Sequence, residues 1–472
     1  MTVPAVTMRS ALSDQMLLGN VLAGDSWAIW RVVLIAAMGE ALTDDELVVF
    51  ESVTGRKSSP TQRVEEALFL IGRRGGKDRA TSVLASYLAA FVDWRPVLSR
   101  GERGLVLCIG PDQRQAQIQR DYIAGAFEAS PLLSKLVTNQ TADSIELSSG
   151  IAIEVRAANF RRLRGVTAVA VIATEASFWF SDETSGNPDT EILGAVRPAL
   201  ATTGGPLIVI TSPYARRGEV WETYRRHYGL AGDPSILVVQ GASRDFNPTL
   251  KQSVVDRAVE RDPAAASAEY LAQFRSDIEA FLTREAVESV TIPDRMELPP
   301  EWNIPYVAFV DPSGGSSDSM TLAIAHSGQD RKIVVDAIRE RKPPFSPEAV
   351  VQEFCELLRT YRISSVTGDR YAGEWPRERF RAHDVEYLTA ERTASDIYRE
   401  FLPLVNGGRL ELPDHPRLLS QLVQLERRTS RSGKDSIGHP PNSHDDIANS
   451  VCGVVNLIAG RVSYPVPVFS TY

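Results

Sequence analysis

Acidic residues stand where three predicted elements of the second half of the chain begin or end. Asp311 follows an apolar run, and Asp369 follows a second short predicted strand. Asp445 and Asp446 open a pattern over 447–458 that is typical of a helix packed along one apolar side. Carboxylates from two strand ends and a helix start form a site for hard divalent cations such as Mg²⁺ or Mn²⁺. Two such ions about 3.5–4 Å apart stabilise the attacking and leaving oxygens of phosphodiester cleavage, so this half is interpreted as a nuclease.

A Gly-rich turn in the first half follows an apolar strand pattern and precedes a helical pattern. Its candidate ATP-binding residues are Gly72, Arg73, Arg74, Gly75, Gly76, Lys77 and Asp78. Such a turn points backbone N–H groups at phosphates, and the dipole of the following helix adds to the attraction. Lys77 would reach the β- and γ-phosphates of ATP. The turn departs from the P-loop pattern, which has Gly in place of Ile71 and Ser or Thr in place of Asp78.

The apolar run 169–173 predicts another strand, which leads into Thr174 and Glu175. An acidic residue after such a strand is expected in a Walker B element, where Glu175 would activate water for ATP hydrolysis. The Asp that usually precedes it and organises Mg²⁺ is replaced by Thr174. The usual hydroxyl after the lysine is therefore replaced by the carboxylate of Asp78, and the usual carboxylate at the strand end is replaced by the hydroxyl of Thr174. One hypothesis is a compensated swap that preserves Mg²⁺ binding, and the other is a weakened or lost ATPase; the sequence leaves both open.

Hydroxyl and guanidinium groups lie close to these elements in sequence. A third strand pattern, 207–211, ends in Thr211 and Ser212, which could sense the γ-phosphate and pass its loss to neighbouring elements. Three arginines, Arg73, Arg74 and Arg164, are candidates to stabilise charge on the transferring phosphoryl group. Arg164 is the candidate arginine finger for a neighbouring subunit. A contact with DNA or a plain surface position is the alternative for each arginine.

The order of the predicted elements indicates an α/β protein with two domains. Residues 1–58 form an N-terminal helical lead-in. Apolar runs that alternate with helical patterns predict a P-loop (RecA/ASCE-like) ATPase domain with a parallel central sheet over 59–278. A charged, Pro-containing stretch, 279–300, is the predicted linker. Three successive strands followed by alternating helices and strands are the order of a ribonuclease-H-like nuclease domain, predicted over 301–472.

The composition is that of an ordinary globular protein, with 43% hydrophobic and 24% charged residues among 472. A net charge of −9 argues mildly against a protein that coats nucleic acid, but local basic patches can still hold DNA. The sequence shows neither a bilayer-spanning apolar run nor a signal-peptide pattern, so no membrane association is expected. Three well-separated cysteines lacking CxxC spacing are predicted to be buried and reduced, which suits a cytoplasm.

With these elements in order, the chain resembles the large terminase subunit of tailed bacteriophages. The resemblance covers nearly all of the chain and rests on collinear motifs at 42–47 (LTDDEL), 72–77 (GRRGGK), 171–179 (VIATEASFW), 211–213 (TSP), 311–315 (DPSGG), 368–373 (GDRYAG) and 444–446 (HDD). It implies an ATP-driven motor that pulls double-stranded DNA into a procapsid and an endonuclease that cuts concatemeric DNA. The implied cofactors are ATP with Mg²⁺ at the P-loop and Mg²⁺ or Mn²⁺ at the nuclease site.

The resemblance also implies roles for particular residues and partners. Lys77 and Glu175 would serve ATP, and Glu175, Asp311, Asp369 and Asp446 would be catalytic. Asp311, Asp369 and one or both of Asp445 and Asp446 would hold metal. The implied partners are the portal protein of the procapsid, a small terminase subunit and further copies of the chain in a ring, with a monomer as the alternative in isolation. The expected location is the host bacterial cytoplasm and, transiently, the procapsid portal.

Two other functions compete with a packaging motor. One is a ribonuclease-H-like nuclease whose vestigial ATPase domain serves only as a scaffold; it would cleave DNA without turning over nucleotide. The other is an assembly protein whose ATPase half merely docks to a portal, and it would tolerate a change at Lys77. A helicase is disfavoured because helicases usually need a second RecA-like domain where this chain carries its acidic residues.

Overall fold

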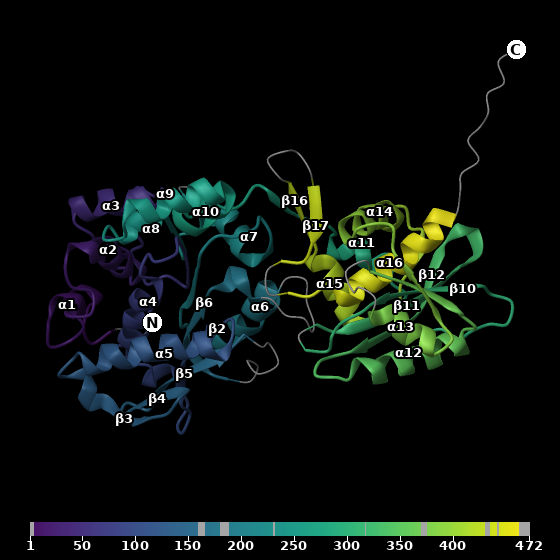
Figure 1. Ribbon diagram of the computed structural model, residues 1–472. Coiled ribbons are helices and arrows are strands. Elements are labelled where there is room, and N and C mark those ends of the chain that lie inside the picture. The colour runs from purple at the N-terminus through teal and green to yellow at the C-terminus, as the bar shows by residue number, and fades with distance from the viewer. Residues whose placement is uncertain are drawn as a thin grey trace, which may run out of the picture. The chain divides into compact units, whose positions relative to one another are not determined.

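The computed structural model describes residues 4–158, 166–179, 188–229, 232–316, 318–369, 375–429, 435–440 and 443–461 (Figure 1). These residues form two compact units that divide between Ser276 and Asp277. Each unit has its own sheet and its own buried apolar clusters. Arg164, the candidate arginine finger, lies outside the described residues.

The first unit begins with the predicted helical lead-in. Its helices are α1 (Met8–Ser13), α2 (Ala28–Ala37) and α3 (Asp44–Thr54). A capping box starts α3: the Thr43 hydroxyl accepts from the N–H of Glu46, and the Glu46 carboxylate accepts from the N–H of Thr43 at 2.8 Å. In α2, the buried Trp30 packs edge-on against Phe69 and Phe246, at ring-centroid distances of 5.8 and 4.9 Å. The lead-in is thereby joined to the core of the unit.

An eight-stranded sheet forms the centre of the first unit, in the order β3-β4-β5-β2-β6-β7-β1-β8. Its strands are β1 (Glu66–Ile71), β2 (Gly104–Gly110), β3 (Val137–Gln140), β4 (Ser144–Leu147), β5 (Ile151–Ala157), β6 (Ala168–Thr174), β7 (Leu207–Thr211) and β8 (Ile236–Gly241). The six neighbouring strands from β5 to β8 run parallel, and β4 pairs antiparallel with β5. Strand β7 lies between β1 and β6, as in the RecA/ASCE-like class. The predicted parallel sheet is confirmed.

Both faces of this sheet are covered, which explains why its central strands are continuous apolar runs. The helices of the unit after the lead-in are α4 (Lys77–Ala90), α5 (Gln113–Glu128), α6 (Pro188–Leu200), α7 (Gly218–His227), α8 (Ser243–Phe246), α9 (Gln252–Arg261) and α10 (Pro263–Leu271). Alternate strand residues point to opposite faces: Phe69 packs in a cluster with α4 and α5, whereas Leu68 and Leu70 pack in a cluster with α6 and α7.

The second unit is built on a six-stranded sheet in the order β14-β13-β10-β11-β12-β15. Its strands are β10 (Tyr306–Asp311), β11 (Met320–Ser327), β12 (Ile333–Arg341), β13 (Ser365–Gly368), β14 (Glu386–Thr389) and β15 (Leu410–Glu411). The first three strands are antiparallel neighbours, and β13 and then β14 extend the sheet parallel to β10. This arrangement agrees with the predicted ribonuclease-H-like order. A separate small sheet is made of β9 (Ile278–Ala280), β16 (Glu426–Thr429) and β17 (Asp435–Gly438).

Helices again cover both faces of the six-stranded sheet. They are α11 (Arg284–Glu288), α12 (Pro347–Thr360), α13 (Trp375–Ala382), α14 (Ala394–Asn406), α15 (Pro416–Gln424) and α16 (Asp446–Arg461). Helices α12 and α13 pack on one face, and α14, α15 and α16 pack on the other. The contact of α16 with β10 is close, because a Cβ at Gly453 would lie 2.5 Å from the Phe309 ring. The segment 279–300, interpreted from the sequence as a linker, carries part of β9 and all of α11.

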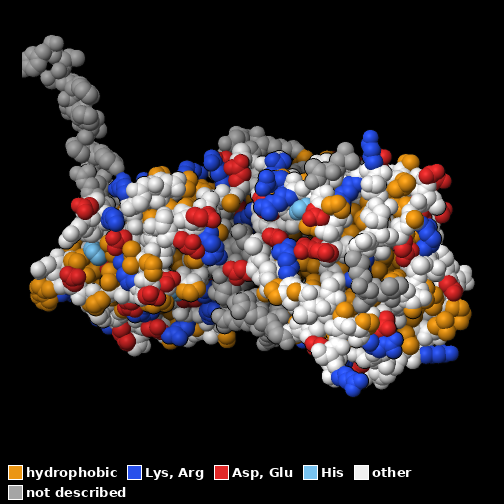
Figure 2. Space-filling model, turned by 180° about the vertical axis from the view of Figure 1, so that it is seen from behind, with side chains coloured by type: hydrophobic (Ala, Val, Ile, Leu, Met, Phe, Trp, Pro, Cys, Tyr) orange, Lys and Arg blue, Asp and Glu red, His pale blue; other side chains and the backbone are white. Residues whose placement is uncertain are grey.

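The distribution of charged side chains and cysteines agrees with what the composition predicts. Basic and acidic side chains are interspersed on the face seen in Figure 2. The cysteines Cys108, Cys355 and Cys452 are free and buried, as predicted. Within the described ranges, no helix combines the length and apolarity needed to cross a membrane.

Candidate functional site

The Gly-rich turn joins β1 to α4, and its backbone geometry requires glycine at the last position before the helix. Gly76 is the N-cap of α4 and has φ +84°, a conformation that L side chains rarely adopt. A Cβ at this position would also lie 2.7 Å from the Trp27 ring. Because Gly76 offers no side-chain cap, the first N–H groups of α4 are available to an anion.

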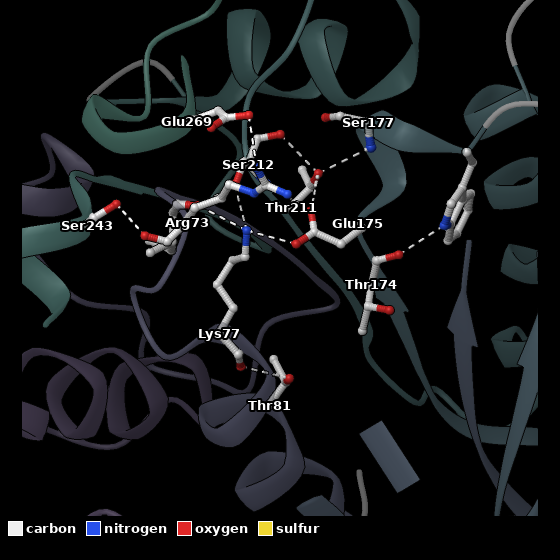
Figure 3. A network of polar contacts seen from close by, with 12 residues as sticks. Arg73, Lys77, Thr81, Thr174, Glu175, Ser177, Thr211, Ser212, Ser243 and Glu269 are labelled. Carbon is white, nitrogen blue, oxygen red and sulfur yellow. Dashed lines mark hydrogen bonds and ion pairs between the residues drawn. The ribbon is translucent and has the colours of Figure 1, made fainter. Parts of the chain in front are cut away.

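Neighbouring elements fix the shape of this turn through its carbonyl groups. The buried indole of Trp30 donates to the carbonyl of Gly75 at 2.7 Å. The Ser243 hydroxyl donates to the carbonyl of Arg73 at 2.6 Å (Figure 3). Gly72 also packs closely on this serine, since a Cβ there would lie 2.8 Å from the Ser243 nitrogen. The turn is therefore held in one conformation by the lead-in helices and by the segment after β8.

Lys77 is the centre of a polar network formed at the ends of three parallel strands (Figure 3). Its buried Nζ lies 3.0 Å from Glu175 Oε1 and donates to Ser212 Oγ at 2.6 Å and to the Ile71 carbonyl at 3.2 Å. The second carboxylate oxygen of Glu175 accepts from the N–H of Ser212 at 3.3 Å and from the Thr211 hydroxyl at 3.4 Å. The carboxyl ends of β1, β6 and β7 thus bring these predicted residues together, as neighbouring parallel strands do.

Asp78 and Thr174 both flank this network but differ in their surroundings. The Thr174 hydroxyl donates to the carbonyl of Ile109 on β2 at 3.2 Å. Burial raises the pKa of the Asp78 carboxyl, the charge of Glu175 raises it further, and Lys77 opposes both. A carboxyl in these surroundings is stabilised in its charged form by a cation. Asp78 is thus better suited than Thr174 to bind a divalent cation.

Of the three predicted arginines, the structure describes Arg73 and Arg74, and both side chains are exposed. Arg73 is exposed and pairs with Glu269 at 3.0 Å. Arg74 is exposed and has φ +65°, and its carbonyl accepts from the side-chain amide of Asn247 at 2.9 Å. Neither side chain is fixed toward the place where a phosphate would lie, so a role in phosphoryl transfer would require them to turn inward.

A cavity of about 910 Å³ in the second unit is lined by all four acidic residues predicted to hold metal. Asp311 is the last residue of β10 and Asp369 directly follows β13, so two parallel neighbours deliver them to the same edge of the sheet. Asp445 and Asp446 stand at the start of α16, which packs on β10. The predicted convergence of two strand ends and a helix start therefore holds in the structure.

Negative charge is concentrated in this cavity. Burial raises the pKa of Asp311 well above its usual range, and Asp446, Asp369 and Asp445 raise it further, although a hydrogen bond from Asn449 opposes them. Burial also raises the pKa of Asp446 to about 6. A divalent cation would relieve this repulsion, and carboxylate oxygens are the donors that Mg²⁺ and Mn²⁺ prefer.

The two carboxylates at the start of α16 have separate hydrogen-bond partners. Asp445 Oδ2 accepts from the buried Tyr398 hydroxyl at 2.8 Å, and Asp446 Oδ2 accepts from the N–H of Ser319 at 3.2 Å. In the part of the chain that the structure describes, no three His, Cys, Asp or Glu side chains are grouped closely enough to hold a metal ion as they stand. The adjacent acids are thus fixed by different elements, Asp445 by α14 and Asp446 by the residue before β11.

The side chains of His444 and Asp318 lie at the rim of the cavity. His444 Nδ1 lies 3.3 Å from Asp318 Oδ1, and both side chains are at least one-third exposed. Both residues line the cavity. Their exposure places them at the edge of the cavity rather than at its base.

Sequence reasoning missed several residues that support this site. Asn449 donates to Asp311 Oδ2 at 3.0 Å from one turn further along α16. Two buried glutamines of α15 hold the segment from behind: Gln424 accepts from the Ser443 hydroxyl at 2.7 Å, and Gln421 accepts from the N–H of Ala448 at 3.0 Å. The spacing of Asn449 from Asp446 on a predicted helix was an available signal. The glutamines gave none, because only the packing of α15 on α16 explains them.

No family model and no curated protein sequence matches the chain. Solved structures do: that of the HK97 bacteriophage large terminase is 16% identical, with a TM-score of 0.38, over 84% of this chain and 91% of that one. The large terminase of a thermophilic bacteriophage, in complex with ADP, is 11% identical, with a TM-score of 0.38, over 88% and 98%. The large terminase nuclease of the thermophilic phage G20c, with bound magnesium, is 14% identical, with a TM-score of 0.33, over 38% and 98%. These three solved structures, to which this chain is similar, are phage large terminases or their nuclease part.

Proposed function

We propose that this chain is the motor-nuclease subunit of a viral DNA packaging machine. It translocates double-stranded DNA into a procapsid at the expense of ATP and cuts concatemeric DNA with a metal-dependent endonuclease. The observation that carries the proposal is the presence in one chain of two constellations, each at the carboxyl ends of parallel strands. One joins Lys77, Glu175 and Ser212, and the other gathers the carboxylates around Asp311 and Asp446.

In the ATPase half, the chain's own residues suit the binding of a triphosphate. The N-terminus of α4 offers N–H groups, and Lys77 offers a buried positive charge next to them. A polyphosphate would compete with Glu175 and Ser212 for this charge. Release of Glu175 from Lys77 would leave its carboxylate free to orient and deprotonate the attacking water. Thr211 and Ser212, bonded to Glu175, would transmit the change to β7.

In the nuclease half, the carboxylates would hold divalent cations, which supply an activated water and stabilise the leaving oxygen. Asp311 and Asp446 are the best candidates for direct ligands, because Asp446 contributes the largest charge effect on Asp311. Asp369 would complete the site from β13. Asp445 is bound by Tyr398 and would orient the start of α16 as well as add negative charge. The cavity of about 910 Å³ has room for a phosphodiester group beside these side chains.

The second candidate function is a ribonuclease-H-like nuclease with a vestigial ATPase domain. The observation that favours it is that Thr174, whose hydroxyl donates to the Ile109 carbonyl, stands at the position where a carboxylate usually organises the metal. Exchange of the two residues tests the point: Asp78→Thr/Thr174→Asp should recover ATPase if the pair is a compensated swap. Additive losses in the single and double variants would contradict the swap, whereas an unchanged chain that hydrolyses no ATP would favour the vestigial domain.

The experiment that tests the proposal measures ATP hydrolysis with Mg²⁺ and plasmid cleavage with Mn²⁺ on the same purified chain. Turnover that disappears in Lys77→Ala, together with cleavage that disappears in Asp311→Asn, supports a motor-nuclease. Cleavage without turnover, even with DNA and partner subunits added, supports the nuclease with a silent ATPase fold. The proposed partners, a portal protein, a small terminase subunit and further copies of the chain in a ring, are tested by whether they raise the turnover.

A further inference from the structure

We propose that Asn449 is a member of the cation site, in addition to the four carboxylates. Its amide N–H groups hold Asp311, and its amide oxygen serves the hydrated cation. The inference rests on the proposed nuclease function and names a residue that the acidic pattern does not contain.

The position of Asn449 follows from the geometry of α16. The residue lies three positions after Asp446, so both side chains project from the same side of the helix. Asn449 lines the cavity together with the four carboxylates. Only 5% of the residue is exposed, so its polar atoms depend on partners inside the cavity rather than on bulk water.

Only one end of the Asn449 amide has a partner among the described residues. Nδ2 donates to Asp311 Oδ2 at 3.0 Å, whereas Oδ1 is buried and accepts no hydrogen bond from them. While Asp311 is ionised, as it would be beside a bound cation, the amide cannot be turned over, because an ionised carboxylate only accepts hydrogen bonds and can pair only with the nitrogen end. Buried side-chain oxygens without a donor are rare and demand an explanation. A cation or its bound water supplies the missing partner.

The chemistry of an amide suits this place better than a further carboxylate. Five acidic residues already line the cavity, Asp318 among them, and three of the other four raise the pKa of Asp311. An asparagine adds an oxygen without a charge, and amide carbonyls are ordinary ligands of oxygen-loving cations. Its nitrogen end at the same time fixes the rotamer of Asp311, which a carboxylate at this position would repel. A purely structural role would use Nδ2 and leave the orientation of Oδ1 unexplained.

The test measures the affinity of the full chain for Mn²⁺, by following the electron paramagnetic resonance signal of free Mn²⁺ during a titration. Asn449→Leu removes both polar ends at similar size, and we expect Mn²⁺ binding to weaken about 10-fold or more. Asn456→Leu is the matched control: it makes the same change on α16 at a residue that pairs with Glu400 outside the cavity, and its affinity should equal that of the unchanged chain.

Two further variants keep the test decisive. Asn449→Asp retains an oxygen but loses the donor to Asp311, and a ligand role predicts that Mn²⁺ affinity falls clearly less than in Asn449→Leu. Should Asn449→Leu fail to fold, Asn449→Ser shortens the side chain and should show the same weakening. Affinity within 2-fold of the unchanged chain in the folded Leu or Ser variant overturns the inference, as does a loss in Asn449→Asp equal to that in Leu. An unchanged chain that binds no Mn²⁺ and cuts no DNA overturns the nuclease proposal as well, so the two failures are distinguishable.

Discussion

Lys77 and Glu175 form an ion pair with 3.0 Å between Nζ and Oε1, although one residue starts the helix after β1 and the other follows β6. Lys77 is almost fully buried, so its charge is balanced mainly by this carboxylate and by the oxygens of Ser212 and Ile71. The same two groups are those that would bind phosphate and activate water. The pair therefore couples occupancy of the phosphate site to the freedom of the proposed catalytic carboxylate.

The first prediction concerns Lys77 itself. Lys77→Ala should lower ATP hydrolysis by at least about 100-fold, because a buried cation aimed at the phosphates is lost. Lys135→Ala, at an exposed position of the same unit, is the control and should leave hydrolysis unchanged. Hydrolysis by Lys77→Ala within a few-fold of the unchanged chain would contradict the assignment of this turn as a phosphate site.

A second prediction separates Asp78 from Thr174. Asp78→Asn should lower Mg²⁺-dependent hydrolysis about 100-fold, since a bound cation would offset the cost of burying the charged Asp78 carboxylate. Thr174→Val, which keeps the shape and removes a hydrogen bond to Ile109, should cost less than about 10-fold. The measurement is ATP turnover against Mg²⁺ concentration. The reverse order of the two effects would show that the hydroxyl, rather than the carboxylate, organises the ion.

The third prediction ranks the neighbouring carboxylates of α16. Asp446→Asn should abolish measurable Mn²⁺-dependent plasmid cleavage, because Asp446 is the neighbouring carboxylate that raises the pKa of Asp311 most. Asp445→Asn should reduce cleavage only about 10-fold, as expected for a residue that supports a ligand. Tyr398→Phe removes the hydroxyl that donates to Asp445 and should reduce cleavage to the same extent as Asp445→Asn. Equal and complete losses in Asp445→Asn and Asp446→Asn would mean that both side chains bind metal.

A fourth prediction concerns the repulsion among the carboxylates. Mn²⁺ at about 100 times its dissociation constant should raise the free energy of unfolding by about 2.7 kcal/mol. Asp311→Asn should stabilise the protein in EDTA, because it removes a buried charge, and should abolish the stabilisation by Mn²⁺. Thermal unfolding with and without Mn²⁺ measures both effects. Asp384→Asn, a charge removed from an exposed position of the same unit, should show neither.

The fifth prediction is a pH dependence of stability that arises at His415. This residue is the N-cap of α15, and its Nδ1 accepts from the N–H of Leu418 at 3.3 Å, which a protonated ring could not do. Burial lowers the pKa of His415 below its usual value of 6.5. The unfolded chain therefore binds the proton first, so the stabilisation is complete above pH 6.5 and declines as the pH falls below it.

This N-cap contributes about 1 kcal/mol to the free energy of unfolding. His415→Asn keeps a good N-cap that does not titrate in this range. The difference in unfolding free energy between the unchanged chain and this variant, measured from pH 8 to pH 5, isolates the contribution of His415. A difference that does not change with pH would show that the imidazole stays neutral or that its cap contributes nothing.

Local features of this protein were predictable because they are encoded within a few residues. The helix predicted to follow the paired acids was confirmed, because α16 starts at Asp446. The strands of the parallel sheet were recognisable as continuous apolar runs, since burial on both faces leaves no alternation. The positions of Gly76, Lys77, Asp311 and Asp446 at element ends followed from the same patterns.

The sequence by itself determined which residues stand at the ends of strands and helices, because these depend on short-range periodicity and turn chemistry. Only the tertiary structure decided which ends meet. The place of β7 between β1 and β6 brings Ser212 to Lys77, and the packing of α16 on β10 turns Asn449 toward Asp311. Such contacts join residues that are far apart along the chain, so no local pattern specifies them. These contacts are specified by strand order and helix packing, which are set by burial of the whole core.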